Sequence, residues 1–120
     1  MQDGKAVEDF LPLKPNWLHI LLALAGQEQH GYAIMQEVSE RTDGKLRLWP
    51  ATLYGTIRQL SEAGLIEKGE ERPTEDDDPR RRYYRLTEMG DRVLAAEARR
   101  LQTLAELVQV RRQSRRAESP

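Results

Sequence analysis

The C-terminal part of the chain carries an apolar repeat that a domain of this size cannot bury by itself. Leucine or valine recurs every seven residues, with one more leucine at an intermediate position: Leu94, Leu101, Leu104 and Val108. This spacing is typical of a coiled-coil seam, although Glu97 and Arg111 interrupt it. We expect one helix over residues 88–112, with these four residues as the interface to a second copy of the chain.

The composition is that of a small globular protein. Of 120 residues, 38% are hydrophobic and 32% are charged, and the net charge is −1. Disordered and membrane proteins have other proportions of hydrophobic and charged residues. The longest apolar run, WLHILLALA, is far shorter than the roughly 20 residues that span a bilayer. The N-terminus lacks the basic and apolar regions of a signal peptide. We therefore expect a cytoplasmic protein with no membrane partner.

Few residues are suited to catalysis or metal binding. The chain has no cysteine and two histidines, His19 and His30, so disulfides, thiolate chemistry and a histidine-rich metal site are not expected. The EDDD run at 75–78 lacks the spacing and the glycine of a calcium-binding loop. No paired nucleophile and base, convergent acids or phosphate-binding glycine loop stands out. The sequence predicts a protein that is not an enzyme and needs no metal or cofactor.

Three helices and a short strand are expected in the first half of the chain. Asn16 is placed as the N-cap of an apolar first helix, and a second helix is expected over 32–41. The alternating LRLW at 46–49 favours a short strand. A third helix is expected to begin with Pro50 at its first position and to end at Gly64. Its buried stripe on a helical wheel is Leu53, Ile57 and Leu60.

A β-hairpin is expected next, from LIEKGEER at 65–72 and RRRYYRL at 80–86, with an acidic tip between them. This order of elements predicts a mainly α fold with a small β-hairpin (α+β), a winged helix-turn-helix followed by a long C-terminal dimerisation helix. The expected parts are an N-terminal arm at 1–15, the winged helix-turn-helix at 16–87, the dimerisation helix at 88–112 and a disordered tail at 113–120.

Three stretches of the chain resemble the PadR family of transcriptional regulators: LLALAGQEQHGYAIMQEV, LRLWPATLYGTIRQLSEAGLIE and RRRYYRLTEMGDRVL. The resemblance spans about residues 18–94 and includes a His-Gly-Tyr at 30–32 and a Thr-Leu-Tyr at 52–54. It implies a winged helix-turn-helix regulator that binds DNA as a homodimer. The single C-terminal helix is similar to that of the small members of the family.

The face of the third helix opposite its buried stripe begins with small residues and then carries a basic residue, Arg58. In a DNA-reading helix of this type the N-terminal part enters the major groove, where small residues let the backbone come close. Arg58 is suited to a guanine and Gln59 to an adenine, and the hydroxyls of Thr52 and Tyr54 are suited to phosphates. The alternative is that Gly55 relieves crowding against the second helix while Tyr54 packs over the core.

A basic run at 80–82 lies on the second hairpin strand. Its arginines are placed to reach phosphates or the minor groove; the alternative is a solvated charge run paired with the acidic residues of the wing. The predicted DNA-binding residues are Lys45, Ala51, Thr52, Tyr54, Gly55, Arg58, Gln59, Arg80, Arg81 and Arg82.

The resemblance implies a repressor that binds an inverted-repeat operator in double-stranded DNA and is released by a small-molecule effector or another signal. Phe10 and Trp17, near the start of the first helix, are the candidates for an effector slot; the alternative is that they are plain core or interface residues. The near-zero net charge and the acidic wing leave a second hypothesis open, a winged-helix protein-interaction module without a specific DNA site.

Overall fold

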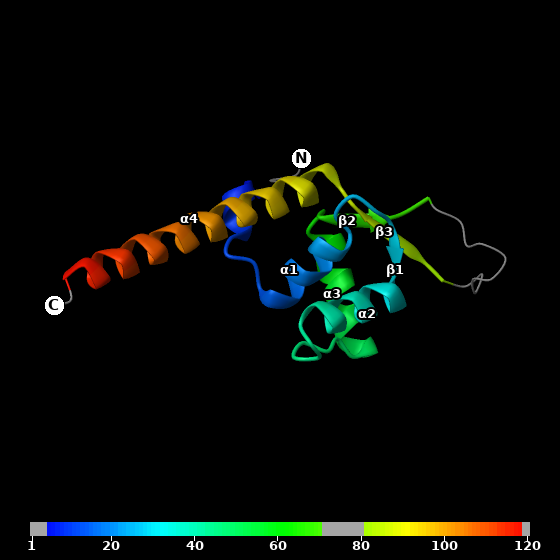
Figure 1. The fold of residues 1–120 in the computed structure, drawn as a ribbon. Helices are drawn as coiled ribbons and strands as arrows, with labels where there is room; N and C mark the ends of the chain where they lie inside the picture. Colours follow the sequence, from blue (N-terminus) through cyan, green and yellow to red (C-terminus); the bar gives the residue numbers. More distant parts are fainter. Residues whose placement is uncertain (1–4, 71–80, 119–120) are drawn as a thin grey trace.

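The computed structural model describes residues 5–70 and 81–118. Its elements in chain order are η1 (Val7–Phe10), α1 (Pro15–Ala23), β1 (Gln29–His30), α2 (Gly31–Arg41), α3 (Pro50–Glu62), β2 (Ile66–Lys68), β3 (Tyr83–Leu86) and α4 (Glu88–Glu118). The strands form an antiparallel sheet in the order β1-β3-β2. Figure 1 shows α1, α2 and α3 gathered beside this sheet, while α4 runs past them and projects far beyond the rest of the molecule.

The core lies between the three short helices and the start of α4. The predicted stripe of α3 is confirmed, since Leu53, Ile57 and Leu60 are all buried. They belong to one cluster with Ile20, Leu21, Ile34, Val38 and Val93. Pro50 is the first residue of α3, and Gly64 follows its end with a φ of +80°, as predicted for a glycine that terminates a helix. The burial of this stripe determines which face of α3 points outward.

Two local predictions before α3 are wrong. Helix α1 begins at Pro15 rather than after an Asn16 cap, because the fixed φ of proline suits the first helical position. Residues 46–49 form no strand; their alternation instead places leucines against the core on the way from α2 to α3. The third strand of the sheet is β1, whose Gln29 and His30 pair with β3.

The N-terminal arm is tied to α4 through a buried carboxylate. The 3-10 helix η1 packs on α4, and the N–H of Leu13 donates to Oε2 of Glu97 at 3.0 Å. Arg100 donates to the other oxygen of Glu97 at 2.5 Å. The hydrogen bond from Arg100 is the main reason that the pKa of Glu97 lies below its ordinary value, against the opposing effect of burial. The residue that interrupts the apolar repeat therefore anchors the arm.

Helix α4 is longer than predicted. It continues to Glu118, so the predicted disordered tail is wrong for residues 113–118. This stretch is rich in arginine, glutamine, alanine and glutamate, which favour helix, and its arginines lie near the negative end of the helix dipole. Of the predicted seam, Leu94 is half-buried against the chain's own core. The other three residues, Leu101, Leu104 and Val108, are 42%, 46% and 55% exposed.

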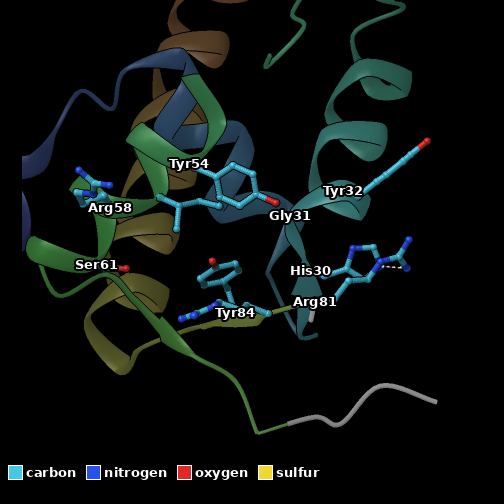
Figure 2. Close-up of a pocket in the computed structure, with 10 residues that line it drawn as sticks. His30, Gly31, Tyr32, Tyr54, Arg58, Ser61, Arg81 and Tyr84 are labelled. Atoms are coloured by element: carbon cyan, nitrogen blue, oxygen red, sulfur yellow. Dashed lines mark hydrogen bonds between the residues drawn. The ribbon is translucent and has the colours of Figure 1, made fainter. Parts of the chain in front are cut away.

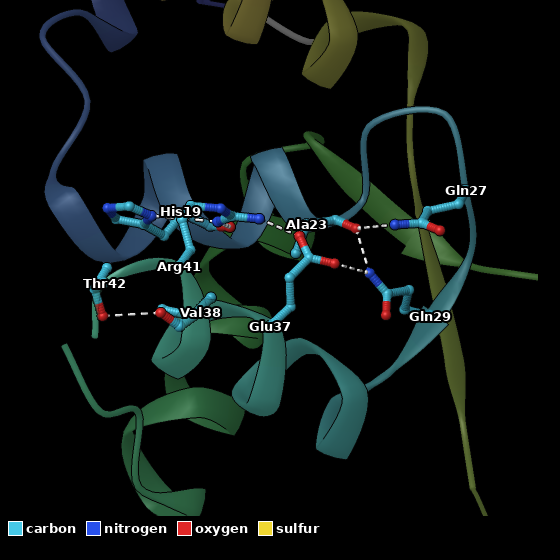
Figure 3. A network of polar contacts seen from close by, with 8 residues as sticks. All are labelled: His19, Ala23, Gln27, Gln29, Glu37, Val38, Arg41 and Thr42. Atoms are coloured by element: carbon cyan, nitrogen blue, oxygen red, sulfur yellow. Dashed lines mark hydrogen bonds and ion pairs between the residues drawn. The ribbon is translucent and has the colours of Figure 1, made fainter. Parts of the chain in front are cut away.

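A polar network joins α1, β1 and α2 (Figure 3). The side-chain amide of Gln29 donates to the carbonyl of Ala23 at 2.5 Å and to Glu37 at 2.9 Å. Arg41 pairs with Glu37 and donates to the carbonyl of His19 at 3.3 Å. These bonds fix α2 against α1 and hold the start of α2 beside the sheet.

Two classes of feature are missing from the described part of the chain. No helix within residues 5–70 and 81–118 has the length and apolarity needed to cross a membrane. Over the same residues, no group of three His, Cys, Asp or Glu side chains is gathered as it would be around a metal ion. The acidic run at 75–78 lies outside the described residues.

Candidate nucleic-acid interface

The outward face of α3 lies open to solvent. All the residues predicted on it are exposed: Ala51, Thr52, Tyr54, Gly55, Arg58 and Gln59. A Cβ added at Gly55 would meet nothing within 4 Å among the described atoms, and this glycine does not have a positive φ. Crowding against α2 and backbone strain are therefore not the reasons for Gly55. A face that begins with an alanine and a glycine allows the helix backbone to approach another surface closely.

A cleft of about 700 Å³ lies beside this face (Figure 2). It is lined by residues from the end of β1, from the start of α2, from α3 and from β3 with the two residues before it: His30, Gly31, Tyr32, Tyr54, Ile57, Arg58, Ser61, Arg81, Arg82 and Tyr84. Three of these residues are arginines, and no acidic residue is among them. A concave surface lined by cations and hydroxyls attracts anions, and phosphate esters have the matching charge and acceptors.

Gly31 allows Tyr54 to reach the start of α2. A Cβ added at Gly31 would lie 2.5 Å from the hydroxyl oxygen of Tyr54 and 2.9 Å from the ring carbon that bears it. Figure 2 shows the Tyr54 hydroxyl directed at Gly31 across the cleft. The Tyr54 side chain is half exposed, so it does not lie fully over the core as the alternative interpretation required. Sequence reasoning singled out both residues but did not pair them.

His30 caps α2 and lies beside a wing arginine. Its Nδ1 accepts from the N–H of Ala33 at 3.2 Å, so its side chain caps the start of the helix. Its Nε2 lies 3.2 Å from a guanidinium nitrogen of Arg81, and its ring meets Tyr83 edge to face at 5.4 Å. The Arg81 guanidinium also lies 6.0 Å from the centre of the Tyr32 ring. Because Nδ1 of His30 accepts a hydrogen bond, Nε2 carries the proton and cannot accept from Arg81, so the Tyr32 ring is a favourable neighbour of this guanidinium and the His30 ring is only a close contact.

The other arginines of α3 and of the wing have different surroundings. Arg58 and Arg82 form no ion pair within the described part of the chain. Arg85, by contrast, donates to Glu67 at 2.8 Å and lies 3.5 Å from Glu28, so it holds the hairpin together. The predicted contact residue Arg80 lies outside the described residues.

Tyr84 forms part of the cleft and belongs to the packed side of β3. Together with Leu86 it packs against the core. Burial raises the pKa of Tyr84, with a further rise from Tyr54 and a smaller opposing effect of Arg82. Its hydroxyl is therefore a neutral donor at physiological pH.

The remaining predicted site residues lie elsewhere. Lys45 is exposed in the loop between α2 and α3 and does not line the cleft. Phe10 and Trp17 are half-buried against the core, also away from the cleft.

Comparison with known proteins identifies the family. The model of the transcriptional regulator PadR-like family matches residues 20–96. The chain belongs to this family. PadR-like proteins are transcriptional regulators rather than enzymes, in agreement with the prediction that no catalysis occurs here.

Individual relatives agree with this placement. An uncharacterized protein of Lysinibacillus sphaericus is 33% identical over 78 residues, which are 63% of this chain and 68% of that protein. A PadR family transcription regulator from Clostridium difficile R20291 has a TM-score of 0.67 at 23% identity, covering 80% of this chain and 96% of that one. Bacillus subtilis PadR, solved in complex with operator DNA, has a TM-score of 0.58 at 21% identity, covering 71% of this chain and 47% of that one. The predicted winged-helix fold with a C-terminal helix is confirmed.

Proposed function

We propose that this PadR-like regulator binds an inverted-repeat operator as a homodimer and represses the genes beside it. The observation that carries the proposal is the outward face of α3, open at Ala51 and Gly55 and bordered by a cleft with three arginines. A protein of the same fold, Bacillus subtilis PadR, binds operator DNA. The chemistry of the face and the fold of the relative both favour double-stranded DNA as the partner.

Helix α3 reads the bases in this proposal. Its first two turns enter the major groove, where the missing side chain at Gly55 lets the backbone approach the base edges. Arg58, one turn further, has the forked donors that pair with a guanine, and Gln59 has the amide that pairs with an adenine. Thr52 lies in the first turn, where the free N–H groups of the helix also favour a phosphate.

The cleft holds the DNA backbone. Arg81, which lies over the Tyr32 ring, and Arg82 donate to phosphate oxygens beside the groove that α3 occupies. The Tyr54 hydroxyl, held over Gly31, supplies a hydrogen-bond donor to the same strand. These contacts position the protein on the duplex and do not read its sequence.

A second copy of the chain completes the regulator. The part of α4 from residue 101 to 117 is exposed throughout, and it carries the predicted interface residues Leu101, Leu104 and Val108. Pairing of these helices places two copies of α3 about 34 Å apart, so that they occupy successive major grooves. Action on chromosomal DNA places the protein in the cytoplasm.

A small-molecule effector is the proposed signal for release. It binds between the arm and α1 near Phe10 and Trp17, which touch the same core as α4. Because tight binding needs both half-sites at once, a change in the angle between α4 and the winged helix is sufficient to release the operator.

The decisive experiment is selection of genomic fragments with the purified protein, followed by titration of the enriched duplex. We expect Arg58→Ala to cost about 1–3 kcal/mol and to relax preference at one base position, and Arg81→Ala to weaken all duplexes alike. Arg99→Ala, on the exposed surface of α4, is the control.

Salt dependence separates this proposal from a protein-interaction module. A DNA-binding protein loses affinity steeply as salt rises, because each phosphate contact releases counterions. Failure to enrich any fragment over random DNA at moderate salt would contradict the proposed function.

A further inference from the structure

The loop between α2 and α3 alternates between buried and exposed side chains. Leu46 and Leu48 pack inward, and Leu48 is 4% exposed. Lys45, Arg47 and Trp49 point outward between and beyond them. We call these three residues the loop ridge. In Figure 1 the loop lies at the lower side of the molecule, on the opposite side from α4.

The position of Trp49 is unfavourable for the stability of the folded chain. It is 65% exposed, which leaves much of a large apolar ring in water. It also occupies the N-cap position of α3 and makes no capping hydrogen bond there, because an indole has a donor and no acceptor. A serine at this position would remove both costs. Helix stability therefore does not explain this tryptophan.

The surroundings of Trp49 indicate a polyanion as the surface that covers it. Lys45 and Arg47 form no ion pair within the described part of the chain, and the first turn of α3 contains no acidic residue. The ridge also continues directly into Pro50 and Ala51, where the outward face of α3 begins. A partner that lies on that face reaches the ridge without a gap.

We propose that the loop ridge is a second contact with operator DNA, at the rim of the major groove that α3 enters. Lys45 and Arg47 bind phosphates, and the Trp49 ring packs against the deoxyribose and base edge beside them. The contact rests on the proposed function and extends it from α3 and the cleft to the loop before α3. Trp49 makes the main contribution to this contact, since an apolar ring adds contact area that cations cannot supply.

The two tryptophans of the chain allow a direct test. In the variant W17F, Trp49 is the only indole, and saturation with an enriched operator duplex should quench its emission and shift it to the blue. In the matched variant W49F, the emission of half-buried Trp17 should stay unchanged. The affinity of both variants is measured in parallel by fluorescence anisotropy of a labelled duplex.

A second variant separates binding from stability. Trp49→Ser introduces a capping side chain, so we expect its Tm to rise by about 2–8 °C. Its affinity for the operator should nevertheless fall about tenfold, whereas Trp49→Phe keeps most of the affinity.

Three outcomes would count against the proposal. If W49S binds the operator as tightly as the wild type, or if the emission of W17F is unchanged at saturation, the ridge is not a DNA contact even though the protein binds DNA. If the wild type itself binds no duplex, the proposed function fails, and the ridge contact fails with it.

Discussion

Two glycines of this chain, Gly55 and Gly90, lack a side chain in opposite surroundings. The position of a Cβ on Gly55 is empty, and the residue lies inside α3 with an ordinary helical backbone. The position of a Cβ on Gly90 is filled by the backbone carbonyl of Leu65, against which the first turn of α4 packs. Gly90 is therefore needed for the fold, and Gly55 is not.

This difference predicts opposite effects of one substitution on stability. Gly55→Ala should raise the free energy of unfolding by up to about 1 kcal/mol, because alanine favours helix and nothing obstructs it. Gly90→Ala should lower it by about 1–3 kcal/mol, because backbone must move. Urea denaturation followed by circular dichroism measures both.

The operator affinity of Gly55 variants tests why a destabilising residue is present. A leucine at 55 has room in the free protein but would fill the space that DNA needs, so Gly55→Leu should fold normally and fail to bind the selected operator. Undiminished binding of Gly55→Leu would show that α3 does not approach DNA on this face.

At the scale of elements, Glu97 is the link between the arm and α4. The carboxylate accepts from Leu13 and Arg100 in the folded state, which lowers its pKa relative to the unfolded chain. A carboxyl whose pKa is lowered on folding stabilises the protein at pH values above its unfolded pKa of about 4.3. This contribution is lost as the pH falls from there toward the lower pKa of the folded state. The arm should therefore loosen as folded Glu97 becomes protonated.

Glu97→Gln isolates this contribution. At pH 7 the variant should be less stable by about 1–3 kcal/mol, because it loses the charged partner of Arg100 inside a buried site. The difference from the wild type should shrink as the pH falls from about 4.3 through the lower pKa of folded Glu97, since the carboxyl is then protonated first in the unfolded and finally in the folded state. Arg99→Gln, next to Arg100 and exposed, should match the wild type at every pH. A pH-independent deficit in Glu97→Gln would refute the role of the charge.

Elements were predictable from sequence where their periodicity reflects burial. The spacing of Leu53, Ile57 and Leu60 defines the inner face of α3 and, by exclusion, the outer face on which the candidate site lies. Strand β1 has two residues and no apolar alternation, so only its pairing with β3 reveals it. The contact between Gly31 and Tyr54 joins two helices, and the role of Glu97 joins segments 84 residues apart. Local patterns carry no information on such pairs.

At the scale of the molecule, the shape of the chain predicts a partner. The chain extends over 65 × 41 × 24 Å, and Figure 1 shows α4 as the long projection. Residues 101–117 of this helix are exposed on every side, Leu107 and Val110 among them. A helix without tertiary contacts is only marginally stable in water. Its apolar residues gain the missing burial when two such helices pair.

Leu101→Glu tests the pairing and its link to DNA. A charge on the seam should convert the dimer to a monomer in analytical ultracentrifugation, whereas Gln102→Glu, the exposed neighbouring residue, should leave the dimer intact. Dimerisation makes the second half-site contact intramolecular, so the wild type should prefer a full palindrome over a single half-site by about a hundredfold or more. Leu101→Glu should lose this preference while it binds the isolated half-site as the wild type does. If the variant stays dimeric and keeps the preference, the two copies are joined by another surface.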